Sequence, residues 1–267
     1  MPLQDYRPLF KWFASYMEGF RGAGGALPGP LEFKRVHSAR VAGNAALIAA
    51  GLGLDGEESA LARAAGLLHD AGRFNQYKLY ASFKDAGSLD HGLEGRRVLE
   101  AEAAPLFPDA AGRERLLCAV QYHNRKAEDL PADLPPGHDS LLKLVRDADK
   151  LDILGELVSS VETDGFRSLH AMVPDIKLTR EMTPGVLEAA ARGETLAIKD
   201  LFTLADILVM AAGWFSDLNY GPARRLAADR GFLRRIRAQL PGAAGLDAYF
   251  ASLEAAAGAR GPGYRLF

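Results

Sequence analysis

Apolar residues along most of the chain recur every three or four positions, the spacing that places them on one face of a helix. This pattern predicts an all-α fold, and we identify no strand. Before Gly165, the predicted helices lie within residues 3–20, 31–52, 61–70, 90–99, 113–123 and 140–160. After Gly165, the pattern predicts a strongly apolar helix over 201–215 and two helices that open at Pro184 and Pro222, since proline is favoured in a first turn.

Two stretches interrupt the helical pattern. Residues 21–30 are rich in glycine and proline and predict a loop. Residues 74–90 show no sustained period, which predicts a loop or short helical pieces, and long irregular segments of compact domains are often functional. We therefore expect an N-terminal helix and loop over 1–30, a helical core over 31–160, and a C-terminal helical extension over 161–267 packed on the same domain.

The segment 61–73 combines an apolar helix with a pair of residues that can bind metal. Its apolar positions repeat at helical spacing, and His69 and Asp70 follow directly in the last turn. Gly72 stands where a left-handed residue would end the helix. Neighbouring side chains on a helix diverge by about 100°. The imidazole of His69 can therefore face one metal ion while the carboxylate of Asp70 reaches between two.

Four further residues of metal-binding type lie on inward helix faces or near helix ends. His37 shares a helix face with Val41, and His91 stands in the first turn of its helix. His123 lies near the end of a helix. Asp149 lies on an apolar stripe, where a carboxylate is costly unless it is paired or bound to a metal. These four residues are candidates for a common site with His69 and Asp70.

Four imidazoles and two carboxylates suit iron, manganese, cobalt, nickel or zinc, whereas magnesium and calcium prefer oxygen ligands. The number of ligands predicts two divalent transition-metal ions. Two such ions, two carboxylates and a bridging hydroxide leave the centre positively charged, so that it would attract a phosphate group.

The composition narrows the class of protein further. The chain of 267 residues is 48% hydrophobic and 25% charged, which is typical of a soluble globular protein. Its net charge of −2 argues against a broad nucleic-acid-binding surface. The single cysteine, Cys118, cannot form an internal disulfide, and charges interrupt the apolar runs within 1–20 and 196–215. We expect a cytoplasmic protein without a membrane segment. For Asp206, inside an apolar helix, a capping or solvated role is favoured over a role in a pocket.

The order of the candidate ligands resembles that of the HD superfamily of metal-dependent phosphohydrolases, an all-α family named for its adjacent His-Asp pair. The resemblance covers roughly residues 31–154. It implies a core of four ligands, namely His37, His69, Asp70 and Asp149. It also implies that His91 and His123 are the additional histidines of the subfamilies that hold two metals, with Asp70 as the bridge. Asp147 and Asp152 lie close to the position of the family's late aspartate, which Asp149 matches by its sequence setting.

The resemblance implies a phosphohydrolase that cleaves a nucleotide or other small phosphoester with a metal-activated hydroxide. Asp70 is then a catalytic residue, and Arg73 and Arg125 are expected to contact the phosphate, because arginine binds phosphate in a bidentate manner. The sequence departs from the cyclic-di-GMP phosphodiesterase branch, since no Gly-Tyr-Pro motif follows His123. Two alternatives remain: an oxygenase similar to myo-inositol oxygenase with a mixed-valent di-iron site, and a non-catalytic HD module that binds a ligand or partner.

Overall fold

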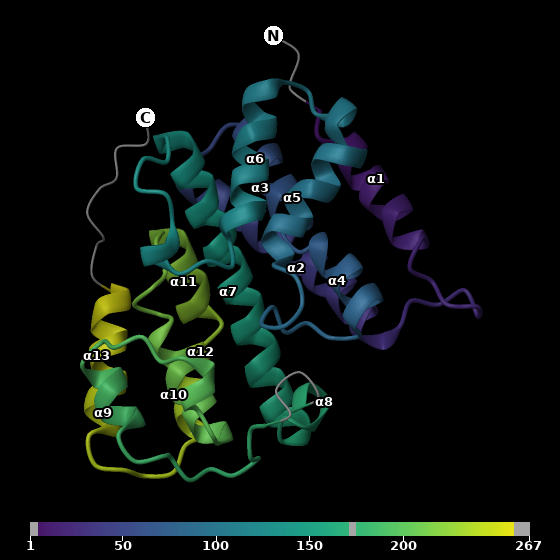
Figure 1. The fold of residues 1–267 in the computed structure, drawn as a ribbon. Coiled ribbons are helices and arrows are strands. Elements are labelled where there is room, and N and C mark those ends of the chain that lie inside the picture. The colour runs from purple at the N-terminus through teal and green to yellow at the C-terminus, as the bar shows by residue number, and fades with distance from the viewer. Residues whose placement is uncertain (1–4, 171–174, 259–267) are drawn as a thin grey trace. The chain divides into compact units, whose positions relative to one another are not determined.

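The computed structural model describes residues 5–170 and 175–258, which are predominantly helical and contain no β-strand (Figure 1). An isolated parallel bridge joins Lys177 and Thr203. The predicted all-α fold is confirmed. None of the helices in these residues has the length and apolar character needed to cross a membrane.

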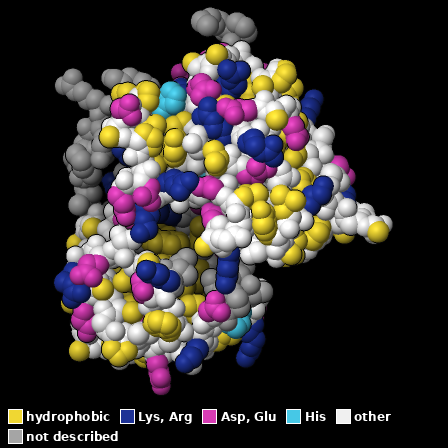
Figure 2. Space-filling model, in the orientation of Figure 1, with side chains coloured by type: hydrophobic (Ala, Val, Ile, Leu, Met, Phe, Trp, Pro, Cys, Tyr) yellow, Lys and Arg dark blue, Asp and Glu magenta, His cyan; other side chains and the backbone are white. Residues whose placement is uncertain are grey.

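The chain divides into two compact units, with the boundary between Asp152 and Ile153. This boundary falls within helix α7, which continues from the first unit into the second. The predicted ranges 1–30, 31–160 and 161–267 stay a prediction. On the face of the molecule in Figure 2, Lys and Arg side chains lie interspersed with Asp and Glu side chains, as the small net charge leads us to expect.

The first unit contains seven α-helices, counting the first part of α7, and two short 3₁₀ helices among its described residues. They are α1 (Arg7–Glu18), α2 (Gly29–Leu52), α3 (Gly56–Leu68), α4 (Gly72–Tyr80), α5 (His91–Glu102), η1 (Ala104–Leu106), α6 (Ala110–Tyr122), η2 (Ala127–Asp129) and α7 (Pro136–Asp164). Aspartates at the N-caps of α3, α5 and α6 accept hydrogen bonds from backbone N–H groups that have no partner within the helix.

Helices α2 and α3 pack closely because small residues lie between them. A Cβ atom added to Gly66 would meet the Ala45 side chain and the Val41 carbonyl oxygen at 3.1 Å each. Leu68 of α3 and Ile48 of α2 are fully buried on the same two helices. Burial of such side chains is worth about 1.5–3 kcal/mol each. The close packing holds the helices that carry the first two candidate histidines.

The predicted left-handed cap at Gly72 is wrong. Gly72 begins helix α4 and is not among the residues with positive φ. Its lack of a side chain serves a different purpose, since an added Cβ would meet the carbonyl oxygen of His91 at 2.1 Å and the backbone nitrogen of Gly95 at 2.6 Å. The start of α4 therefore lies directly against the first turns of α5, and this contact requires glycine.

The second unit continues from α7 through a series of shorter helices. These are α8 (Arg167–His170), α9 (Val186–Ala191), η3 (Ile198–Asp200), α10 (Leu204–Gly213), α11 (Gly221–Asp229), α12 (Phe232–Ala238) and α13 (Leu246–Gly258). The helix expected to open at Pro184 begins instead at Val186, because Gly185 adopts φ 88° and acts as its N-cap. Asp206 is fully buried and forms a capping box with Thr203 at the start of α10, as its favoured interpretation predicted.

Candidate metal centre

The six candidate ligands lie on helices α2, α5 and α7 of the first unit and directly after the ends of α3 and α6. His37 lies on α2, His69 is the C-cap of α3, and Asp70 follows it. The remaining three are His91, the first residue of α5, His123, the C-cap of α6, and Asp149 on α7. All are buried except Asp149, whose side chain is 19% exposed. The structure thus gathers ligand-type side chains that are up to 112 positions apart in the sequence, and it does so largely at helix ends.

The first ligand group consists of His37, His69, Asp149 and the Oδ2 atom of Asp70. Nε2 of His37 lies 3.2 Å from Nε2 of His69 and 3.2 Å from Oδ1 of Asp149. Oδ2 of Asp70 lies 3.5 Å from Nε2 of His37 and 3.6 Å from Nε2 of His69. Ligands to one ion held at about 2.0–2.2 Å from each would be separated by about 3–3.6 Å.

The second ligand group consists of His91, His123 and the Oδ1 atom of Asp70. Nε2 of His91 lies 3.1 Å from Nε2 of His123, and each of these nitrogens lies 3.6 Å from Oδ1 of Asp70. The two oxygens of Asp70 therefore face different groups. A carboxylate in this arrangement can bridge two ions, as the sequence led us to expect.

The Nδ1 atoms of the four histidines have partners that leave the Nε2 atoms available to a metal. His69 and His123 donate Nδ1–H to the carbonyl oxygens of Gly66 and Val120, each at 2.8 Å. A carbonyl can only accept, so in the neutral rings Nε2 carries the lone pair. Nδ1 of His37 and of His91 each lies 2.7 Å from a carboxylate oxygen. This is the usual orientation of metal-binding histidines, in which the second ring nitrogen donates to a carbonyl or carboxylate.

The charges at the site also suit a bound cation. Burial would raise the pKa of Asp70, but Lys34, His69 and neighbouring groups hold that pKa well below its ordinary value. The same holds for the pKa of Asp149, where contacts with His37 and His69 outweigh burial. Burial lowers the pKa of His91 to about 4, so its ring is neutral at neutral pH. Burial lowers the pKa of His37, but contacts with Asp149 and Asp152 raise it above its ordinary value, so His37 must give up a proton when an ion binds. Ionised carboxylates and neutral imidazoles are the forms that bind metal.

One oxygen at the site has no hydrogen bond to balance its burial. Oδ1 of Asp149 is buried beside Nε2 of His37 at 3.2 Å and Nε2 of His69 at 3.6 Å, and neither contact has the geometry of a hydrogen bond. Leaving a buried carboxylate oxygen without a partner is costly, unless an ion takes the place of a donor. The donor set therefore fits divalent transition metals.

Comparison with known families bears directly on this site. Residues 35–154 match the family model described as HD domain. The chain contains an HD domain. All six ligand-type residues lie inside the matched range, and the resemblance drawn from the sequence is confirmed. No curated protein and no solved structure matches the chain. HD domains belong to a superfamily that consists mostly of metal-dependent hydrolases and binds divalent metals.

Several residues around the HD-domain ligands were not predicted from the sequence. Nζ of Lys34 lies 2.7 Å from Oδ2 of Asp70, one helical turn before His37. Asp152 accepts hydrogen bonds from Arg40 at 2.6 and 3.1 Å and lies beside Nδ1 of His37. The position of Lys34 three residues before His37 places both on one face of α2, a spacing that could have identified it.

The two arginines expected to contact phosphate lie in different surroundings. Nε of Arg73 is buried, donates no hydrogen bond to the described residues and lies 3.4 Å from Oδ1 of Asp70. Its Nη1 donates to Asp85 and to the carbonyl oxygen of Phe83. Arg125 forms an ion pair with Asp90, the N-cap of α5, and is 44% exposed. Their roles in substrate binding stay predictions.

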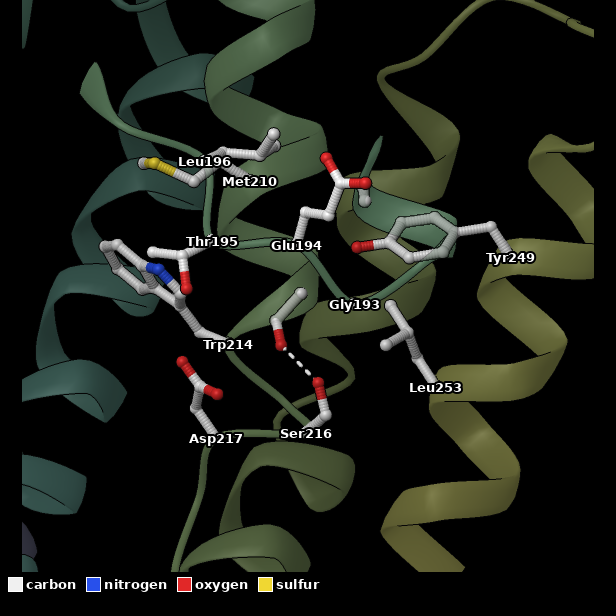
Figure 3. A pocket seen from close by; sticks show the side chains of 12 residues that line it. Gly193, Glu194, Thr195, Leu196, Met210, Trp214, Ser216, Asp217, Tyr249 and Leu253 are labelled. Atoms are coloured by element: carbon white, nitrogen blue, oxygen red, sulfur yellow. Dashed lines mark hydrogen bonds between the residues drawn. The ribbon is translucent and has the colours of Figure 1, made fainter. Parts of the chain in front are cut away.

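A separate pocket of about 100 Å³ lies within the second unit (Figure 3). Trp214 and Tyr249 form part of its wall, with the carboxylates of Glu194 and Asp217 nearby. Glu194 forms an exposed ion pair with Arg192. The residues that line this pocket include no histidine or cysteine, so they provide no set of metal ligands like that of the HD domain.

Proposed function

We propose that the protein is a metal-dependent phosphohydrolase that cleaves a small phosphoester at a centre of two divalent transition-metal ions. The observation that carries this proposal is the placement of Asp70, whose two carboxylate oxygens face two separate groups of histidines. A buried carboxylate between two sets of nitrogen ligands is the arrangement needed to share one side chain between two ions. The family match supports the coarser class of metal-dependent hydrolase.

In this proposal His37, His69, Asp149 and Asp70 hold one ion, and His91, His123 and Asp70 hold the other. The ions would supply Lewis acidity, which activates a water as the nucleophile and stabilises negative charge on the phosphate. The first group has four protein ligands and the second has three, so the second leaves more positions for water and substrate. Iron, manganese, cobalt, nickel and zinc all fit this donor set.

The side chains beside the ligands would orient the reacting groups. Lys34 holds Oδ2 of Asp70 through one N–H, and its ammonium has two further donors for a phosphate oxygen. The buried Nε–H of Arg73 gives another donor next to Asp70. Arg125 would contact the substrate at the exposed start of α5 after leaving Asp90. These cations offset the two carboxylates and favour a substrate that carries negative charge.

The proposal is tested with purified protein loaded separately with Mn²⁺, Fe²⁺, Ni²⁺, Co²⁺ or Zn²⁺ and assayed for phosphate release from phosphomonoesters and phosphodiesters. We expect metal-dependent hydrolysis that Asp70→Asn abolishes, because an amide cannot bridge two cations as a carboxylate does. The matched control is Asp139→Asn, which removes a carboxylate paired with Lys143 on the surface of α7. Hydrolysis that is equal in the two variants would contradict the assignment.

The same four histidines and two aspartates also fit two iron ions, which makes an oxygenase the second candidate. Oxygen uptake by the iron-loaded protein, in the absence of phosphate release from any substrate, would favour it over hydrolysis. Metal binding with neither activity would favour a non-catalytic module.

A further inference from the structure

We propose that Asp85 is a positioning residue for the second ligand group, and that it links the segment 81–90 to binding of the second ion. The proposal rests on the dinuclear centre of the proposed function. Asp85 lies six residues before His91, in the irregular segment between α4 and α5. Its carboxylate oxygens lie 2.7 and 2.9 Å from Nδ1 of His91. This contact fixes the ring so that Nε2 points towards Asp70 and His123.

Asp85 also holds the segment itself. Its Oδ1 accepts hydrogen bonds from Nη1 of Arg73 at 3.0 Å and from Nε2 of Gln76 at 2.8 Å, both on α4. Its Oδ2 accepts one from Nδ2 of Asn124, just after α6, at 3.3 Å. A single carboxylate thus connects α4, α5 and the end of α6. Movement of the segment would move the group that orients His91.

The two ligand groups differ in where the carboxylate that contacts Nδ1 of the histidine comes from. In the first group the carboxylate behind His37 belongs to Asp152, which is on helix α7 only one turn from Asp149 and is nearly fully buried. In the second group the carboxylate behind His91 belongs to a loop, and its side chain is 36% exposed. The second group therefore depends on a segment that can open more readily than a helix.

An ion bound directly by Asp85 and Asp90 would be a different explanation, because these side chains lie near His91. The hydrogen bonds argue against it. All the polar partners of Asp85 named above are donors, and Asp90 caps α5 and pairs with Arg125. The carboxylates are already satisfied, and the nitrogen of His91 that they face is Nδ1, not the Nε2 that points at the ligand group.

The test compares Asp85→Asn with Asp90→Asn in the full chain. An asparagine at position 85 must turn its NH₂ group towards donors, so it breaks the network. An asparagine at position 90 removes the same charge but remains a good N-cap, because Oδ1 accepts the bonds from Gly92, Leu93 and Asn124. Each protein is titrated with Mn²⁺ by calorimetry, and the spin-coupled signal of paired Mn²⁺ ions is followed by electron paramagnetic resonance.

We expect wild-type protein and Asp90→Asn to bind Mn²⁺ in two steps. In Asp85→Asn the affinity for the second Mn²⁺ should fall by about 10–100-fold, the usual effect of losing a group that orients a ligand. The affinity for the first Mn²⁺ should be unchanged. Equal second-step affinities in the two variants would overturn the proposal, and so would a wild-type protein that binds fewer than two ions.

A second measurement needs no variant, so it also applies if Asp85→Asn does not fold. Because coupling is reciprocal, binding of the second Mn²⁺ should slow hydrogen exchange of amides in 81–90 of the wild-type protein. Protection that is complete after the first equivalent, or absent after the second, would overturn the proposal. Two-step binding with this protection, but without hydrolysis of any phosphoester, would support the role of Asp85 while refuting the proposed activity.

Discussion

The contact between Gly72 and the start of α5 gives a sharp prediction for the variant Gly72→Ala. A Cβ at this position would lie 2.1 Å from the carbonyl oxygen of His91, whereas real Cβ contacts essentially never fall below 3.0 Å. The atoms that must move belong to backbone, so α4 and α5 would have to separate by about 1 Å in a close-packed region. Metal–ligand distances deviate from their usual values by only about 0.2 Å. The variant should therefore lose the second ion.

The stability of Gly72→Ala should also fall. Overpacking typically costs about 1–3 kcal/mol, and a clash with backbone belongs at the upper end of this range. For a protein of this size each kcal/mol lowers Tm by about 2–4 °C. The matched control is Gly43→Ala on the exposed side of α2, where an added Cβ meets nothing within 4 Å. Alanine loses less conformational entropy than glycine when the helix folds, so this control should be more stable by about 0.5–1 kcal/mol.

Both variants would be analysed by thermal unfolding and by elemental analysis of bound metal. We expect Gly72→Ala to show a lower Tm and close to one ion per chain, and Gly43→Ala to show an equal or higher Tm and two ions. If Gly72→Ala keeps both ions and the wild-type Tm, the tight contact between α4 and α5 does not position His91, and the reasoning is refuted.

Three further predictions follow from other contacts. Asp152→Asn should lower the affinity for the first Mn²⁺ by about 10-fold or more in a titration, because the variant loses the carboxylate that orients the His37 ring. An unchanged affinity for the first ion would contradict this. The double variant His91→Ala/His123→Ala should retain one ion by elemental analysis and lose most hydrolysis; two retained ions would contradict the assignment. Asp206→Asn should lower the free energy of unfolding in urea by about 1–3 kcal/mol at pH 7. Burial raises the pKa of Asp206, but hydrogen bonds hold it below its ordinary value. The difference in the free energy of unfolding between the wild-type protein and Asp206→Asn should therefore shrink below about pH 4. A difference that stays constant down to about pH 2 would refute the capping role of the Asp206 carboxylate.

The helices and the six candidate ligands could be predicted because each has a local signal. Helical spacing identifies α2 and α3, and a histidine at a helix end or on an apolar face stands out in the sequence. The structure brings those six side chains together, with Asp149 beside His37 and His69.

Helical spacing places Lys34 on the same face of α2 as His37, but the contacts that the groups behind the ligands make could not be predicted, because the partners are distant in sequence. Asp152 meets His37 across 115 positions, and Lys34 meets Asp70 across 36. Gly72 was misinterpreted for a similar reason. A glycine after a helix usually indicates a left-handed cap, whereas here the requirement comes from packing against a helix that begins nineteen positions later. Such tertiary contacts leave no periodic pattern.

The proposed function requires Asp70 to bridge two metal ions. It is tested most directly by anomalous X-ray diffraction from crystals of the Mn²⁺-loaded protein, with data collected to locate manganese. Two anomalous peaks about 3.5–4 Å apart are expected. One would lie against Oδ2 of Asp70 beside His37 and His69, and the other against Oδ1 beside His91 and His123. A single peak, or two peaks that do not share Asp70, would contradict it.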